Sequence, residues 1–413
     1  GILGASFAAV LILFVVPITL LGTISPFAIR LSVDDTSRAG QISGQIYAIS
    51  TLGSFIGTFL PTLVTIPAIG TKNTFLVFSL LLLFVALAGL GKFASRRDLM
   101  THLWMPVVIA IVAALSSGQA LKSNTGQIYE TESAYNYIQV AEQNGFTILR
   151  LNEGQGVHSI YHPQILQYNG PWDQFLVSPY FYADRRPAEI QRVAIVGLAA
   201  GTTARQMTAV YGAIPIDGFE IDPEIVEVGK TYFGMTMPNL SVHIGDGRLN
   251  LEQSPYKYDI IAVDAYRPPY IPPHMTTQEF FQIAASHLTE DGVLTLNSAS
   301  VPGDRRLING LATTMGTIFP SIYTVDIPGS LNTMIFATKQ KTKPESFAAN
   351  LVALSQDPAI HPLLINTMQI TFANLKTGYE TTTVFTDDHA PIEWIVNDMV
   401  IRFILSGGTQ YLQ

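Results

Sequence analysis

The sequence of 413 residues contains no cysteine. This absence excludes disulfide bonds, a thiolate nucleophile, and zinc or iron–sulfur sites built on cysteine ligands. Charged residues are scarce as well, at 13%, where soluble proteins have about a quarter. The net charge is −8 and no long basic run is present, which argues against nucleic acid as a partner.

The scarcity of charge is confined to one part of the chain. No glutamate precedes Glu130, and the few charges before it stand in short clusters between long apolar runs. From Glu130 onward the composition is that of an ordinary globular protein. We therefore predict a boundary near this point, and two or three domains overall.

Four apolar runs precede the boundary. Each is long enough, or nearly so, to span a bilayer as a helix, which takes about 20 residues. They are Leu3–Ile24, Ile42–Ile69, Thr74–Leu90 and Leu103–Leu121. We predict that residues 1–121 form about four transmembrane helices, with the lipid bilayer as partner and kinks at Pro17 and Pro61. No charge lies mid-span, so a plain anchor is favoured over a transporter. The chain begins at Gly1 inside an apolar run, and we expect residues upstream of it.

The charges between the apolar runs bear on topology. With four spans, Lys92, Arg96 and Arg97 lie on the opposite side from the globular part. The positive-inside rule places these residues in the cytoplasm. This rule predicts a multi-pass protein of the cell membrane whose globular part is extracytoplasmic. Use of a cytosolic nucleoside would instead require the globular part to lie in the cytoplasm. The sequence leaves the side open.

The globular part reads as two successive folds. Residues 122–178 contain short β-rich runs around a Gln143-Asn144-Gly145 turn, which predicts a small β-hairpin domain. Residues 179–413 alternate strands and helices, which predicts a doubly wound, Rossmann-like α/β domain of the methyltransferase type.

Polar residues follow successive predicted strands of the second fold. Gly197 and Gly201 lie in "GLAAGT" after the first strand, Glu220 ends the second, and Asp246 follows the third. The glycines permit close approach of a ligand, and the acids stand where ribose hydroxyls and an adenine amine are bound. Each acid alone could be a helix cap or a turn former. Together they predict a nucleoside site.

A fourth strand, "YDIIAVD", ends at Asp264 and is followed by Arg267. We take Asp264 and Arg267 as candidate catalytic residues. Arg267 pointing outward to pair with Asp264 or a neighbouring acid is the alternative. His158 and His162 have a metal-like spacing, but they lie in a strand-and-turn region. We therefore expect packing or surface roles for them, and no metal.

These motifs together resemble the spermidine synthase (polyamine aminopropyltransferase) family. The matching stretches are "ESAYNYIQV", "GLAAGT", "EIDP", "GDG" and "DAYRPP", in the family's order, and the apolar half resembles the membrane-fused members. The resemblance implies that Glu220 holds the ribose and Asp246 the adenine amine. The ligand would be decarboxylated S-adenosylmethionine, or S-adenosylmethionine itself. Tyr135 at the entrance and Asp387 in "TDDHAP" are candidate substrate contacts.

Two departures from the family pattern concern acids. Ala200 stands where the family's GGGDGG loop has an acid, and Arg267 stands at the second acid of D-S-S/T-D-P. Arginine stays protonated and cannot act as a base. Three functions stay open: aminopropyl transfer to an atypical acceptor, a catalytically inactive scaffold, or methyl transfer from S-adenosylmethionine. We expect a homo-oligomer or a complex with other membrane subunits.

Overall fold

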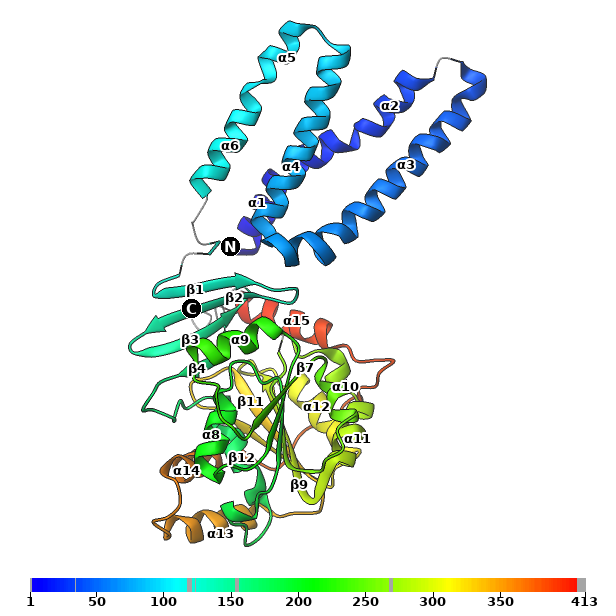
Figure 1. The fold of residues 1–413 in the computed structure, drawn as a ribbon. Coiled ribbons are helices and arrows are strands. Elements are labelled where there is room, and N and C mark those ends of the chain that lie inside the picture. The colour runs from blue at the N-terminus through cyan, green and yellow to red at the C-terminus, as the bar shows by residue number, and fades with distance from the viewer. Residues whose placement is uncertain are drawn as a thin grey trace. The chain divides into compact units, whose positions relative to one another are not determined.

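The computed structural model describes residues 2–33, 35–116, 121–122, 124–152, 156–266 and 270–406. It divides into two compact units, Gly1–Gln119 and Ala120–Gln413. Each unit has its own architecture, the first helical and the second built on two β-sheets (Figure 1).

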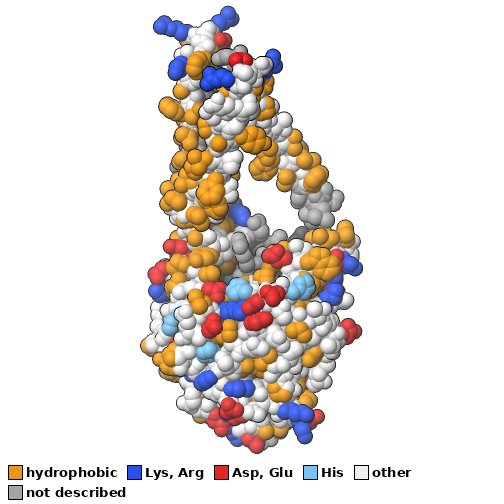
Figure 2. All heavy atoms as spheres, turned by 90° about the vertical axis from the view of Figure 1, so that its right-hand side faces the viewer, with side chains coloured by type: hydrophobic (Ala, Val, Ile, Leu, Met, Phe, Trp, Pro, Cys, Tyr) orange, Lys and Arg blue, Asp and Glu red, His pale blue; other side chains and the backbone are white. Residues whose placement is uncertain are grey.

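The first unit is a chain of apolar helices. Its elements are α1 (Ile2–Gly22), α2 (Ile24–Ser32), η1 (Thr36–Arg38), α3 (Ala39–Leu60), η2 (Pro61–Thr65), α4 (Ile66–Phe93), α5 (Arg96–His102) and α6 (Trp104–Ser116). Large apolar side chains are exposed on it, such as Ile12 at 75% and Phe84 at 70%. Figure 2 shows hydrophobic side chains in orange over these helices. Among the described residues, three helices are long and apolar enough to cross a membrane: Phe7–Ser32, Thr36–Phe93 and Arg96–Leu115.

Two of the predicted runs, Ile42–Ile69 and Thr74–Leu90, lie in one continuous stretch, Thr36–Phe93, of 58 residues. This stretch contains a kink at Gly70, which lies between the two runs. Pro61 does not end the helix, because it opens the π-helical turn η2, whose wider hydrogen-bonding pattern accommodates a missing N–H. The backbone instead leaves helical geometry at Gly70, with φ 77° and ψ 165°. Helices α3 and α4 form two diverging arms (Figure 1).

The second unit begins with a four-stranded antiparallel sheet. Its strands, in order, are β1 (Gln127–Glu132), β2 (Tyr137–Gln143), β3 (Phe146–Leu151) and β4 (Val157–Tyr161). Asn144 and Gly145 join β2 to β3 with φ of 53° and 84°. Two positive φ values are typical of a tight hairpin turn, and β2 and β3 pair antiparallel on either side of it.

An eight-stranded sheet follows, in the order β12-β10-β11-β9-β8-β5-β6-β7. Strands β5 to β9 pair in parallel, and β10, β11 and β12 are antiparallel. The strands are β5 (Val193–Val196), β6 (Ile216–Glu220), β7 (Leu240–Ile244), β8 (Tyr258–Val263), β9 (Leu288–Ala299), β10 (Ser321–Asp326), β11 (Asn332–Thr338) and β12 (Leu375–Lys376). This is a Rossmann-like, methyltransferase-type α/β domain, as the alternating pattern predicts.

Helices connect and cover these strands. They are α7 (Pro171–Gln174), η3 (Phe175–Phe181), η4 (Pro187–Glu189), α8 (Thr202–Tyr211), α9 (Pro223–Tyr232), α10 (Gly247–Glu252), η5 (Pro273–Met275), α11 (Gln278–His287), α12 (Arg306–Gly316), α13 (Pro344–Ser355), α14 (Pro362–Asn374) and α15 (Ile392–Leu405). Helix α9 begins at Pro223 behind the cap Asp222, as proline's fixed φ favours.

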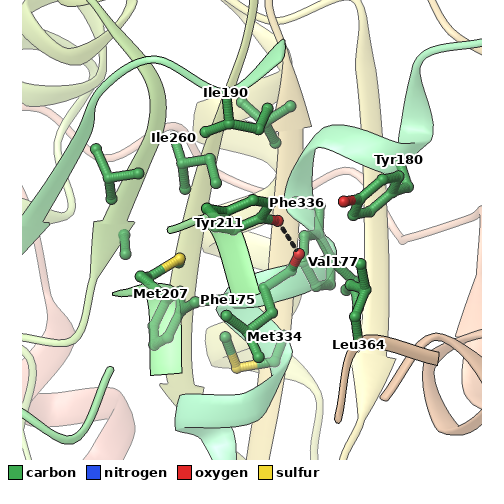
Figure 3. Close-up of a cluster of buried hydrophobic side chains, with 14 of the residues drawn as sticks. Phe175, Val177, Tyr180, Ile190, Met207, Tyr211, Ile260, Met334, Phe336 and Leu364 are labelled. Atoms are coloured by element: carbon green, nitrogen blue, oxygen red, sulfur yellow. Dashed lines mark hydrogen bonds between the residues drawn. The ribbon is translucent and has the colours of Figure 1, made fainter. Parts of the chain in front are cut away.

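The central strands of the eight-stranded sheet, β5, β6 and β8, are buried on both faces. Neighbouring residues of β8 enter different apolar clusters, Ile260 with Phe175 and Phe336, and Ile261 on the other face. Figure 3 shows the first cluster, in which the Tyr211 hydroxyl donates to the Leu176 carbonyl. Double-sided burial explains why these strands are continuous apolar runs. A third cluster packs β2 and β3 against α9 and joins the two sheets.

Candidate nucleoside-binding and catalytic site

A cavity of about 680 Å³ lies at the carboxyl ends of the parallel strands. The strand order reverses at β5, which lies between β6 and β8, and ligands bind in the crevice that such a reversal leaves. The residues that line it from the strand ends are Val196, Gly197, Ala199, Phe219, Glu220, Gly245, Asp246, Asp264, Ala265, Tyr266 and Asn297. The four-stranded sheet and neighbouring loops contribute further residues, including Tyr135, Asn136, Val157, His158, Trp172, His274, Ser330 and Asn332.

The glycine loop forms one wall of the cavity. Gly197 has φ 88°, and a Cβ added there would lie 2.5 Å from the Asp264 carbonyl oxygen. Only glycine fits this approach of two strand ends. Gly201 does not line the cavity. It precedes α8 with φ 85°, where a Cβ would lie 2.6 Å from the Met235 side chain, so it shapes the turn.

Glu220 ends β6 and lines the cavity with its side chain only 7% exposed. Its Oε2 accepts from the Ala199 amide at 2.8 Å, and its Oε1 accepts from the Asp222 amide at 3.1 Å. Burial nevertheless raises the pKa of Glu220 to about 7. The carboxyl group is therefore held beside the glycine loop, where each oxygen retains capacity for a ligand hydroxyl.

Asp246 lies after β7 and caps α10, where its Oδ1 accepts from the Leu249 amide at 3.0 Å. Its Oδ2 lies 2.9 Å from Nε2 of His274, which also lines the cavity. Arg248 Nη1 donates to the His274 carbonyl at 2.9 Å, and both its terminal nitrogens contact Asp387 at 2.7 Å. Asp387 itself does not line the cavity, and its predicted contact with substrate stays a prediction.

Asp264 follows β8 and faces the cavity from the other side of β5. Its Oδ1 accepts from Asn297 Nδ2 at 2.8 Å. Burial raises the pKa of Asp264 to about 7, and the Asn297 bond opposes that rise. A carboxylate with such a pKa can take up a proton near neutral pH, which is what a general base requires.

The remaining predicted residues fall in different places. Tyr135 lines the cavity and is 46% exposed, at its solvent side. Arg267 lies outside the described residues. Ala200 is 1% exposed and packs among Ile225, Val228 and Phe233 rather than on the cavity wall. The position where the resemblance implies a missing acid therefore faces the apolar core here.

The two histidines of the β4 region have separate surroundings. His158 lines the cavity, burial lowers its pKa to about 4, and its buried Nε2 has no hydrogen-bond partner among the described residues. His162 Nδ1 accepts from the amides of Gln164 and Ile165, so this ring shapes a turn. The expectation of a packing role fits His162, whereas His158 belongs to the cavity. Among the described residues, no group of three or more metal-ligating side chains is found.

His158, His274, Asn297 and Trp172 are cavity residues that were not predicted as site residues. Asn297 had a signal, because it is the polar residue near the end of the apolar strand in "GVLTLN". His274 and Trp172 reach the cavity through long-range contacts that a local pattern does not contain.

The sheet order, glycine loop and strand-end acids define a Rossmann-like domain with a cavity at the point where the strand order reverses. The Spermine/spermidine synthase domain family matches residues 183–350. A probable polyamine aminopropyl transferase of Bifidobacterium longum is 30% identical over 302 residues, covering 70% of this chain and 66% of that protein. A polyamine aminopropyltransferase of Vibrio vulnificus is 27% identical over 273 residues, which cover 63% of this chain and 88% of that protein. The mouse eEF1A lysine and N-terminal methyltransferase is 31% identical over 153 residues, which cover 34% of this chain and 22% of that protein.

The chain therefore belongs to the spermidine synthase-like family. It spans just under two thirds of the length of the Bifidobacterium protein.

Proposed function

We propose that this chain is a membrane-anchored transferase of the aminopropyl type. Its cavity binds decarboxylated S-adenosylmethionine, and an amine acceptor attacks beside Asp264. The observation that carries the proposal is the meeting of three strand-end carboxylates, Glu220, Asp246 and Asp264, in one cavity. Its volume of about 680 Å³ lies within the usual range of about 300–1,000 Å³ for small-molecule sites.

The two sides of β5 have separate tasks. Glu220 and Asp246, on the β6–β7 side, hold the ribose hydroxyls and the adenine amine, as the family resemblance implies. On the β8 side, the lone pair of the amine forms a bond to the methylene carbon next to the sulfonium sulfur. The C–S bond breaks with its electron pair going to sulfur, which leaves neutral methylthioadenosine. The amine proton goes to Asp264, which must be ionised beforehand.

The acceptor is less cationic than a diamine. Apart from Glu220, Asp246 and Asp264, the described lining of the cavity contains no acid. Trp172, Ser330 and Asn332 are uncharged, and His158 is neutral at pH 7 because burial lowers its pKa to about 4. A second cationic nitrogen would lack an anionic partner among these residues, and burying an unpaired charge is costly.

Residues 2–116 anchor the transferase in a lipid bilayer. The stretch Thr36–Phe93 would be about 87 Å long as one straight helix, whereas a hydrocarbon core is about 30 Å thick. We infer that it crosses twice and turns near Gly70, where the helical geometry breaks. Lys92, Arg96 and Arg97 then lie opposite the globular unit. The charge rule alone favours an extracytoplasmic location for that unit, whereas binding of a cytosolic nucleoside requires the cytoplasmic side.

Labelling of single introduced cysteines tests the topology, because the chain has none of its own. Ala94→Cys and Ala183→Cys are at exposed positions of the two units. We expect a membrane-impermeant maleimide to label Ala183→Cys from outside the cell and Ala94→Cys only after permeabilisation. The reverse pattern would place the globular unit in the cytoplasm, and labelling of both from one side would overturn the four crossings.

The function itself is tested on the full chain in nanodiscs. Calorimetry with methylthioadenosine should show binding, and incubation with decarboxylated S-adenosylmethionine and butylamine should yield the aminopropylated amine by mass spectrometry. Asp217→Asn is a matched control, because this buried carboxylate of β6 pairs with Arg192 outside the cavity. Binding without transfer of any amine would favour the scaffold. Methyl transfer from intact S-adenosylmethionine would favour a methyltransferase function, an alternative that the similarity to the mouse methyltransferase supports.

A further inference from the structure

Helix α15, red in Figure 1, is apolar on two faces. One face is buried in the globular unit and consists of Ile392, Ile395, Val396, Met399 and Phe403. The other face carries Trp394, Ile401 and Leu405, which we call the apolar stripe. Among the described residues of the globular unit, Leu405 at 73% and Trp394 at 67% are the most exposed large apolar side chains. A surface helix of a soluble domain has polar residues on its outer face, so the stripe indicates a further contact.

The spacing of these three residues places them in one line along the helix. They are seven and four positions apart, which corresponds to two turns and one turn of an α-helix. The charged residues Glu393 and Arg402 lie on either side of the stripe, and Arg402 Nε donates to Asp398 at 2.7 Å. An apolar stripe with a tryptophan and charged flanks is typical of helices that lie in a membrane interface, where an indole ring is apolar on one side and hydrated at its N–H.

Lipid is the partner that an anchored chain always has within reach. Helix α6 ends at Ser116 and β1 begins at Gln127, and a connection of this length reaches at most about 40 Å when fully extended. Docking of the globular unit on the bilayer is then intramolecular, so a small contact suffices. A stable contact with another protein takes about 20–30 residues a side, far more than the stripe offers.

We propose that α15 is an interfacial helix, whose apolar stripe inserts into the lipid surface and fixes the orientation of the globular unit on the bilayer. This inference rests on the proposed membrane anchor and goes beyond it, because an anchor alone leaves the globular unit free to turn on its connection. The stripe reaches the boundary between head groups and acyl chains, about 5–10 Å deep. Glu393, Asp398 and Arg402 provide charges of both signs beside the stripe, so the docking depends on apolar contact rather than on anionic lipid.

The three tryptophans of the chain allow a direct test, because their surroundings differ. Trp394 lies in the stripe, Trp104 begins the apolar helix α6, and Trp172 is buried in the globular unit. Three full-length variants each keep one tryptophan and have phenylalanine at the other two positions. In nanodiscs of brominated phosphatidylcholine, we expect the bromine to quench Trp104 and Trp394 and to leave Trp172 unaffected. Trp394 should be quenched more by bromine near the head groups than by bromine near the ends of the acyl chains.

A charge in the stripe tests whether the docking comes from these side chains. In the variant that keeps only Trp394, Leu405→Glu should abolish most of the quenching and shift the emission to the red, because a carboxylate is costly to place among acyl chains. Val352→Glu is the matched control, since Val352 lies on α13, outside the stripe, and is 61% exposed. This change should leave the quenching of Trp394 as it was.

The outcomes separate the docking from the anchor on which it rests. Quenching of Trp104 without quenching of Trp394 in a folded chain would overturn the docking and leave the anchor intact. An emission of Trp394 that responds to the number of chains per disc and not to bromine would assign the stripe to a second copy of the chain, and would also overturn the docking. Absence of quenching at both positions would overturn the anchor as well.

A second measurement applies if the single-tryptophan variants do not fold. A nitroxide label on Leu405→Cys reports its depth in the otherwise unmodified chain, which has no cysteine of its own. We expect this label to be more accessible to oxygen, which dissolves in lipid, than to a water-soluble nickel complex. The same label on Val352→Cys should show the opposite preference. Equal behaviour of the two labels would contradict the insertion of α15.

Discussion

The two sides of strand β5 differ in how much of an aminopropyltransferase site they keep. On the β6–β7 side, Glu220 and Asp246 both line the cavity at the positions that the resemblance assigns to nucleoside binding. On the β8–β9 side, Asp264 is present, but its partner is the neutral Asn297. This difference underlies our proposal that the chain binds the nucleoside donor of its family and uses a different acceptor.

Removing the proposed base, Asp264, should have the largest effect of the changes considered, because it should lower turnover without weakening nucleoside binding. We expect Asp264→Asn to lower turnover about 10³-fold, within the range that general-base catalysis contributes, and to leave methylthioadenosine affinity nearly unchanged. Single-turnover rates and calorimetry give the two values. Asp259→Asn is the control, since this buried carboxylate of the same strand binds the Gln191 and Arg192 amides away from the cavity. Equal loss in both variants would assign Asp264 a structural role.

Restoring the acid that the family has in its glycine loop should fail at Ala200. The Ala200 methyl packs among Ile225, Val228 and Phe233, so an acid at this position would be buried in the apolar core. We predict that Ala200→Asp destabilises the globular unit by about 3 kcal/mol through a buried, unpaired carboxylate.

Ala199→Asp is the matched comparison for that change. Ala199 lines the cavity with φ 48°, a conformation that aspartate tolerates better than most residues. Thermal unfolding should show a clearly smaller loss for Ala199→Asp than for Ala200→Asp. A larger loss for Ala199→Asp than for Ala200→Asp would mean that residue 199 faces the apolar core and residue 200 faces the cavity.

The pH dependence of stability should follow from the two buried acids. Burial raises the pKa of Glu220 and of Asp264 to about 7, so the folded state holds protons that the unfolded state has released. This contribution is complete below about pH 4 and is lost as pH rises to about 7. We expect the ligand-free globular unit to lose on the order of 4 kcal/mol between pH 5 and pH 7, roughly half from each group. The double variant Glu220→Gln with Asp264→Asn should flatten this part of the profile in denaturant melts.

The smallest predicted effect concerns the ribose contact. Glu220→Gln keeps the size of the side chain but replaces a charged acceptor by a neutral one. Its amide nitrogen also cannot accept from the Ala199 and Asp222 amides as both carboxylate oxygens do. We predict a loss of about tenfold in methylthioadenosine affinity, measured by calorimetry. A larger loss of transfer than of binding would move Glu220 into the catalytic step.

The sequence was informative where function follows strand periodicity. Glu220, Asp246 and Asp264 each follow an apolar run, and parallel strands bring such residues to one edge. Residue spacing does not give the direction of a side chain inside a loop, so the packing of Ala200 in the apolar core could not be predicted. Arg248 and Asp387 form an ion pair although they are 139 positions apart, and no local sequence pattern predicts such a contact. The helix continues through Pro61 because this residue opens a π-helical turn, which the apolar pattern does not reveal.

The most direct test of a retained donor side and a changed acceptor side is a comparison of putrescine with butylamine as acceptors. Both are offered to the full chain with decarboxylated S-adenosylmethionine, and methylthioadenosine release is followed. We predict that butylamine is used at least about tenfold better in kcat/KM, because the second ammonium of putrescine finds no free carboxylate among the described lining residues. Putrescine turnover of about 1 per second or faster, exceeding that of butylamine, would contradict the account.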